Sequence, residues 1–170
     1  MKRFEEFLND NNPQIEIVME NGDSMKLELF PECAPITVEN MLTLVSEKFY
    51  DGIKFHRIIK NFVIQGGDPT GTGMGGSKNQ IKGEFRINGV KNDLLHTKGV
   101  ISMARTNNPN SASSQFFICH ADCKHLDAAY AGFGVVIEGL ETLDKIASTD
   151  TDRYDYPIVP QVIKTIKRIR

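Results

Sequence analysis

The sequence contains no run of apolar residues long enough to cross a membrane. Hydrophobic residues make up 40% of its 170 positions, yet no stretch approaches the roughly 20 consecutive apolar residues of a transmembrane helix. A basic pair, Lys2-Arg3, stands near the amino terminus, but acidic residues follow it where a signal peptide has an apolar core. We therefore expect a cytoplasmic protein that does not contact membranes.

The sequence also has no strong excess of either charge. Its 20 basic and 22 acidic residues give a formal net charge of −2, and they are spread along the chain. This balance provides neither a basic surface for nucleic acid nor a polybasic anchor for lipid headgroups. We expect a neutral partner and no binding of nucleic acid.

Cysteine is scarce. Cys33, Cys119 and Cys123 are an odd number and too few for a disulfide framework, which agrees with a reducing compartment. No G-x-S-x-G segment is present, and no cysteine stands in a recognisable catalytic context. These absences argue against nucleophilic catalysis.

Internal repeats and low-complexity linkers are absent, and a chain of this length can bury one core but is short for two domains. The polar residues before position 14 end in a helix-breaking run of asparagine, aspartate and proline. We predict a short surface extension over residues 1–13 and one domain over residues 14–170.

The apolar pattern predicts an all-β protein with two helices. Apolar and charged residues alternate over residues 15–20 and 25–29, and Asn21-Gly22 between the two runs is a strong hairpin signal. Helical spacing of apolar residues occurs only over 38–45 and 140–147. Further short apolar runs bring the count to about eight strands, with which a closed antiparallel barrel can fill its interior and leave no edges.

Two motifs suggest ligands but lack the expected context. Gly71 to Gly76 spells G-x-G-x-x-G, yet no amphipathic helix follows it to bind a pyrophosphate. Four residues within a short span, Cys119, His120, Cys123 and His125, are potential zinc ligands. Structural zinc sites more often use two ligand pairs set well apart, so we expect no metal and no cofactor.

The remaining candidates are polar residues in apolar surroundings. Arg57 and Gln65 interrupt two short apolar strands, and Gln115 begins a third. A guanidinium is almost never buried without partners, so Arg57 is expected to line a cavity or reach water.

Since neighbours on a strand point to opposite faces, His56 and Arg57 are not expected to face one cavity, and His56 is predicted to be structural. His96 receives no role. If Arg57, Gln65 and Gln115 share a pocket with the apolar residues, that pocket cannot break a covalent bond. The apolar residues are Phe62, Val63, Phe117 and Leu126.

Residues 55–68 match F-H-R-I-I-x-x-F-x-x-Q-G-G-D at every fixed position, and two further segments read G-x-x-S-M-A (99–104) and S-Q-F-F-I (114–118). Leu126-Asp127 and Phe133-Gly134 complete the set. With these motifs the chain resembles the cyclophilin-type peptidyl-prolyl isomerases from about residue 14 to its end. The resemblance implies an eight-stranded antiparallel barrel capped by two helices, and interconversion of cis and trans X-Pro bonds.

The resemblance also implies roles for individual residues. Arg57 would be catalytic, together with Phe62 and Gln65. The loop around Gly73 to Gly76 would border the subsite for the residue preceding proline. Eight residues would bind the substrate: Val63, Ala104, Arg105, Gln115, Phe117, His125, Leu126 and Tyr130.

Three positions depart from the best-known members. His125 stands where many have tryptophan, Tyr130 where many have histidine, and Arg105 where many have asparagine. The tryptophan is the usual hydrogen-bond donor to cyclosporin, so we predict weak binding of this drug. The expected protein is a monomeric isomerase that acts on proline-containing peptides and unfolded proteins and so assists folding. A module that binds proline peptides without turnover is the alternative.

Overall fold

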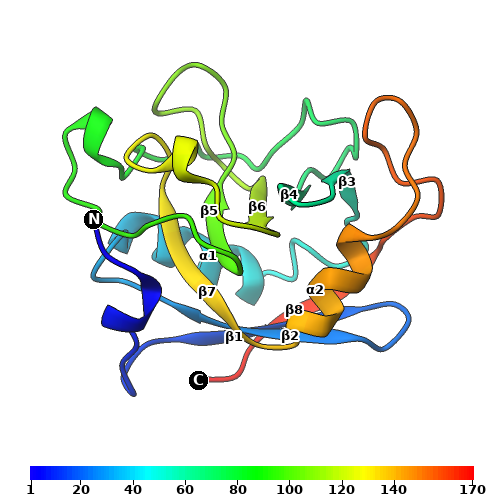
Figure 1. The fold of residues 1–170 in the computed structure, drawn as a ribbon, viewed down its shortest axis with the longest axis horizontal. Helices are drawn as coiled ribbons and strands as arrows, with labels where there is room; N and C mark the ends of the chain where they lie inside the picture. Colours follow the sequence, from blue (N-terminus) through cyan, green and yellow to red (C-terminus); the bar gives the residue numbers. More distant parts are fainter.

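The computed structural model describes all 170 residues, and its largest element is one antiparallel sheet of eight strands (Figure 1). The order of strands across the sheet is β3-β4-β6-β5-β7-β2-β1-β8, and the sheet curls into a half-barrel. Its strands are β1 (Gln14–Met19), β2 (Ser24–Leu29), β3 (Phe55–Ile59), β4 (Val63–Gly66), β5 (Val100–Met103), β6 (Phe116–Cys119), β7 (Gly132–Glu138) and β8 (Ile163–Arg168).

The predicted first hairpin is confirmed. Strands β1 and β2 pair in antiparallel register with Ile17 opposite Met25. Gly22 in the turn has φ of 93°, a conformation that glycine adopts without steric cost. Along β1 every second residue is buried, as the alternation predicted.

The predicted closed barrel was wrong, because the sheet is open between its outermost strands. Strands β3 and β8 share no ladder. Only an isolated bridge between Lys54 and Val162, with hydrogen bonds that include Ile163 N–H to Ile53 O at 2.9 Å, spans the gap. The period-two pattern specifies which side chains point inward, but it carries no information on whether the last strand pairs with an early one.

Both predicted helices are confirmed. Helix α1 (Pro35–Ser46) begins with proline, whose fixed φ suits a first helical turn, and it packs near β8. Helix α2 (Leu140–Ala147) packs near β2, β3 and β4. Neither helix combines the length and the apolar character that a bilayer crossing requires. Three short 3₁₀ helices complete the fold: η1 (Phe4–Glu6), η2 (Arg86–Asn88) and η3 (Lys124–Leu126).

The N-terminal residues 1–13 contact the sheet. The ring of Phe7 is buried and lies 5.8 Å from that of Phe30. The buried carboxylate of Glu28 accepts hydrogen bonds from the Asn9 backbone, from the side chains of Asn12 and Gln14, and from the guanidinium of Arg170. The polar composition of this segment does not predict these contacts. Through the carboxylate of Glu28, these hydrogen bonds join the N-terminal segment to Arg170, the last residue of the chain.

Candidate active site

The site is built on the hairpin of β3 and β4. Arg57 lies opposite Gln65, and the register shifts between Phe55 and Arg57. Asn61 makes the turn with φ of 62°, and its N–H donates to Nδ1 of His120 at 2.8 Å. The hairpin therefore presents both polar residues of the sequence motif from adjacent strands.

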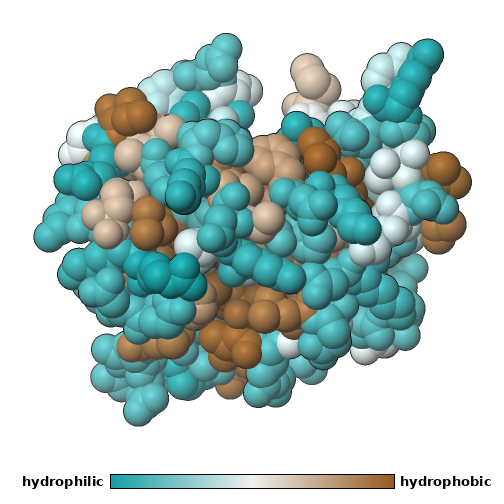
Figure 2. All heavy atoms as spheres, viewed as in Figure 1, coloured by the Kyte–Doolittle hydropathy of each residue, from teal (hydrophilic) through white to brown (hydrophobic).

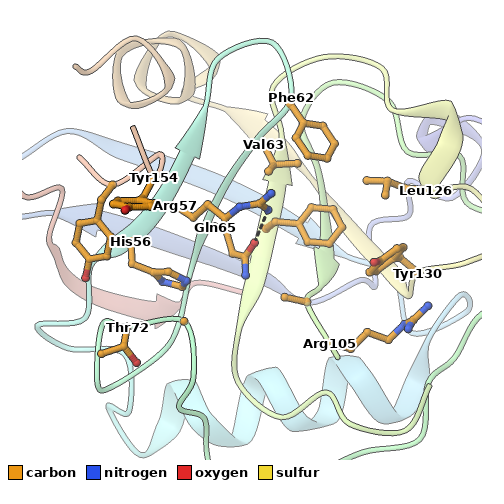
Figure 3. Close-up of a pocket in the computed structure, with 14 residues that line it drawn as sticks. His56, Arg57, Phe62, Val63, Gln65, Thr72, Arg105, Leu126, Tyr130 and Tyr154 are labelled. Atoms are coloured by element: carbon orange, nitrogen blue, oxygen red, sulfur yellow. Dashed lines mark hydrogen bonds between the residues drawn. The ribbon is translucent and has the colours of Figure 1, made fainter. Parts of the chain in front are cut away.

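A pocket of about 440 Å³ opens over this hairpin and β6 (Figure 3). This volume lies within the range of small-molecule sites. Its lining includes most of the predicted site residues, and the full set is His56, Arg57, Phe62, Val63, Gln65, Thr72, Gly73, Ala104, Arg105, Phe117, Leu126, Tyr130, Tyr154 and Tyr156.

A chain of side-chain hydrogen bonds fixes the polar residues. Arg57 Nη1 donates to Gln65 Oε1 at 3.1 Å, and Gln65 Nε2 donates to Gln115 Oε1 at 3.1 Å. Gln115 Nε2 in turn donates to the carbonyls of Gly73 and Gly75 at 3.0 and 2.8 Å. Because each amide has one donor and one acceptor side, this chain sets the orientation of both glutamines. Arg57 has no acidic partner within salt-bridge distance, so most of its N–H donors stay available to a ligand.

The opposite wall is apolar. Val63, Phe117 and Leu126 are buried, and Phe62 packs against the core while partly exposed. The ring of Tyr130 meets Phe117 edge to face at 5.8 Å. The pocket thus places a guanidinium beside a wall that suits a small aliphatic ring (Figure 3).

The side chain of Arg105 supports Tyr130. Its guanidinium carbon lies 4.5 Å from the ring centroid of Tyr130 and 4.8 Å from that of Phe85, and Nη2 donates to the Ala129 carbonyl. The backbone N–H and C=O of Arg105 have no hydrogen-bond partner within the protein, so they remain available to a peptide. Ala104 lines the pocket, but its N–H donates to the Gln115 carbonyl.

Two predicted binding residues lie outside the lining of this pocket. His125 is exposed and stacks on Phe62, with ring centroids 5.3 Å apart. Gln115 instead lines an adjoining polar pocket of about 590 Å³, which the glycine-rich loop borders. Gln65, Gly73, Ala104 and Arg105 line both pockets. His125 can therefore act on a ligand at the rim or by holding Phe62.

The prediction that His56 and Arg57 cannot face one cavity was wrong. Both line the pocket, because the irregular register between Phe55 and Arg57 interrupts the alternation of β3. His56 is buried, and its Nδ1 has no hydrogen-bond partner. Burial lowers the pKa of His56, which Asp68 partly opposes, so the ring is neutral at neutral pH. The sequence pattern of β3 does not predict this bulge.

The potential zinc ligands do not converge. No group of three or more histidine, cysteine or acidic side chains is placed to hold a metal ion. Both ring nitrogens of His120 have protein partners, since Nδ1 accepts from Asn61 and Nε2 lies 2.9 Å from Asp144 Oδ1.

His96, which received no role, lies under the pocket. Its Nε2 is 2.8 Å from Ser102 Oγ, and its Nδ1 is 3.3 Å from Asp127 Oδ1. This arrangement has the order of a catalytic triad, but Ser102 and His96 are buried and no substrate can reach them. Burial lowers the pKa of His96 to about 4, against the opposing effect of Asp127. The neutral ring stacks on Phe117 and supports the apolar wall from behind.

The glycine-rich loop is held by Asp68. This buried carboxylate accepts hydrogen bonds from the backbone N–H groups of Thr70, Thr72, Gly73 and Gly75, and from the Thr70 hydroxyl. Burial raises the pKa of Asp68, but these donors outweigh it and lower the pKa to about 2. A Cβ at Gly75 would lie 2.2 Å from Asp68 Oδ1, so only glycine fits there.

Comparison with known proteins identifies relatives of this chain. Residues 14–168 match the family model described as "Cyclophilin type peptidyl-prolyl cis-trans isomerase/CLD". Peptidyl-prolyl cis-trans isomerase ppi1 of Schizosaccharomyces pombe is 46% identical over 144 residues, which cover 84% of this chain and 90% of that protein. Human peptidyl-prolyl cis-trans isomerase-like 3 is 46% identical over 136 residues, covering 79% and 82%.

Solved structures agree with these relatives. The crystal structure of a cyclophilin type peptidyl-prolyl cis-trans isomerase from Cryptosporidium parvum superposes with a TM-score of 0.86 at 34% identity, covering 94% of this chain and 98% of that one. A second structure of that protein, in the presence of the dipeptide Ala-Pro, gives 0.85 at 34% identity, covering 92% and 99%.

The pKa of Asp68 yields a prediction on stability. Since the folded state lowers this pKa, the carboxylate stabilises the protein fully above its unfolded value near 3.8, and the contribution is lost as the pH falls towards 2. Asp68→Asn should therefore lower the free energy of unfolding by about 1–3 kcal/mol at pH 7, and the difference from the unmodified protein should shrink between pH 4 and 2. Urea unfolding at several pH values between 7 and 2 measures this difference in the free energy of unfolding. Asp51→Asn, at an exposed position, is the control, and an equal loss in both variants would contradict the assignment.

Proposed function

The chain belongs to the cyclophilin-type peptidyl-prolyl cis-trans isomerase family, and on that premise we propose that Arg57 catalyses rotation about X-Pro bonds in unfolded or flexible chains. The supporting observation is the position of its guanidinium. Arg57 is fixed by Gln65 and lines the same pocket as Val63, Phe117 and Leu126. A hydrogen-bond donor and an apolar surface for a proline ring are thus present together.

The barrier that this pocket must lower arises from amide resonance. Rotation about a peptide bond costs about 18–20 kcal/mol, and an X-Pro bond left alone takes tens to hundreds of seconds. In the twisted transition state resonance is lost, and the proline nitrogen carries a free lone pair. An N–H of Arg57 can donate to this lone pair but not to the planar ground state. Stabilisation that exists only in the transition state raises the rate.

The rest of the site holds the substrate on either side of the rotating bond. The apolar wall would bind the proline ring, with Phe62 at its edge and Tyr130 held by Arg105. The free backbone N–H and C=O of Arg105, with the side chains of Gln65 and Gln115, would bind the peptide backbone. One side of the bond can then turn while the other stays fixed. The reaction involves no covalent step and no proton transfer.

We also propose that this chain acts as a cytoplasmic monomer that assists protein folding. Arg57, Phe62 and Gln65 line one pocket together within a single chain, which supports activity as a monomer. The three cysteines are free and buried, which agrees with a reducing compartment. The related structure obtained in the presence of Ala-Pro supports proline-containing peptides as ligands.

Removal of the Arg57 side chain tests the catalytic role. Loss of a hydrogen bond from a charged donor costs about 1.5–3 kcal/mol, so Arg57→Ala should lower kcat/KM for an Ala-Pro peptide roughly 10- to 100-fold. Lys60→Ala, which removes an exposed cation from the same hairpin, should leave the rate unchanged. Urea unfolding of each variant verifies the fold. Full activity of Arg57→Ala would refute the mechanism, whereas tight peptide binding without turnover by the unmodified protein would favour a binding module.

Inhibition by cyclosporin tests the role of His125 at the edge of the pocket. His125 carries no indole N–H, so we expect weak inhibition of the unmodified protein by this drug. His125→Trp should restore the missing donor and lower the inhibition constant roughly tenfold or more, the value of one buried hydrogen bond. The measurement is inhibition of Ala-Pro isomerisation. Tight inhibition of the unmodified protein at stoichiometric drug would contradict the prediction.

A further inference from the structure

The pocket has a second half, and two of its lining residues, Tyr154 and Tyr156, lie outside all the family motifs. Arg57 and Gln65 stand at its middle, with Phe62, Leu126 and Tyr130 on one side (Figure 3). On the other side of Arg57 lie His56, Thr72 and Tyr154. Tyr156 also lines the pocket, and its hydroxyl contacts Gly71, the residue before Thr72. A volume of about 440 Å³ is much larger than one five-membered ring requires. The pocket can therefore hold a second group beside the proline.

The two tyrosines come from the loop between α2 and β8, which is held in a defined shape. Oδ1 of Asp152 accepts hydrogen bonds from the backbone N–H groups of Tyr154 and Tyr156 at 2.8 and 3.1 Å. The Tyr156 hydroxyl donates to the carbonyl of Gly71, and Lys54 Nζ lies 5.2 Å from its ring centroid. Tyr156 thus joins this loop to the glycine-rich loop and forms a fixed wall.

The loop exposes several apolar side chains to solvent. Tyr154 is 70% exposed although it lines the pocket, and Ile158 and Val159 in the same loop are 65% and 64% exposed. Figure 2 shows apolar residues at the edge of the molecule where Figure 1 places the loop that follows α2. Of these three residues only Tyr154 lines the pocket, so its exposed ring is available to a ligand bound there.

We propose that Tyr154 and Tyr156 form a subsite for an aromatic or branched apolar side chain within two residues of the isomerised proline. This proposal rests on the proposed function, because it assumes a proline peptide in the adjoining half of the pocket. The tyrosine rings offer edge-to-face contacts to such a side chain. Lys54 and Arg153 already lie over the rings of Tyr156 and Tyr154, where a substrate lysine would make its cation–π contact, so a lysine is disfavoured there.

The subsite can be tested with two series of peptides built around Ala-Pro. One series varies the residue before alanine and the other varies the residue after proline, each with Phe, Leu, Ala, Glu or Lys. In one series we expect Phe and Leu to give a kcat/KM about three- to tenfold above that of Ala, and Lys to give the lowest value. Tyr154→Ala should bring the ratio of Phe to Ala close to one, and Tyr154→Phe should preserve it.

Ile87→Ala is the matched control, because Ile87 is an apolar residue, 76% exposed, in η2 and absent from the pocket lining. It should leave every ratio unchanged. The subsite is refuted if the active protein shows no preference for Phe or Leu over Ala in either series, or if that preference persists in Tyr154→Ala. Peptide affinity, followed by NMR chemical shifts, separates the two proposals. A Phe preference in binding without turnover would support the subsite and contradict only the proposed function.

Discussion

The hydrogen bond from Arg57 to Gln65 is the interaction on which the site depends. It joins β3 to β4, and Gln115 extends it to the start of β6 and the glycine-rich loop. A long cationic side chain in an apolar pocket has several rotamers, and fixing it beforehand removes that entropy from the reaction. The sheet places the three residues of this hydrogen-bond chain close together, because β3, β4 and β6 are neighbouring strands in a fixed register.

Several polar groups around the pocket position other residues and take no part in the reaction. Neutral His96 supports Phe117 from behind, and Asp68 shapes the loop that accepts hydrogen bonds from Gln115. Arg105 and Tyr130 depart from the common residues of the family, and in this chain they stack on each other. A guanidinium thus holds a tyrosine at the edge of the apolar wall. The substrate contact is left to the backbone of Arg105.

Much of this arrangement could be predicted from the sequence. Alternation and turn residues located the first hairpin, helical spacing located α1 and α2, and the motifs located Arg57, Gln65 and the apolar wall. Prediction failed where tertiary structure overrides a local pattern. The bulge before Arg57 brings His56 into the pocket, and the open seam beside β8 depends on contacts between distant residues. Tyr154 and Tyr156 could not be found, because nothing in an irregular loop indicates which part of the molecule it covers.

The central claim is that the protein lowers the barrier to X-Pro rotation, and binding alone would not satisfy it. The most direct measurement is NMR exchange between the cis and trans forms of a short Ala-Pro peptide, with substoichiometric protein. The account predicts that exchange, which takes tens to hundreds of seconds for the free peptide, becomes fast enough to give exchange cross-peaks or broadened resonances while the cis fraction stays unchanged. Peptide resonances that shift on binding while the exchange rate stays at its uncatalysed value would contradict it.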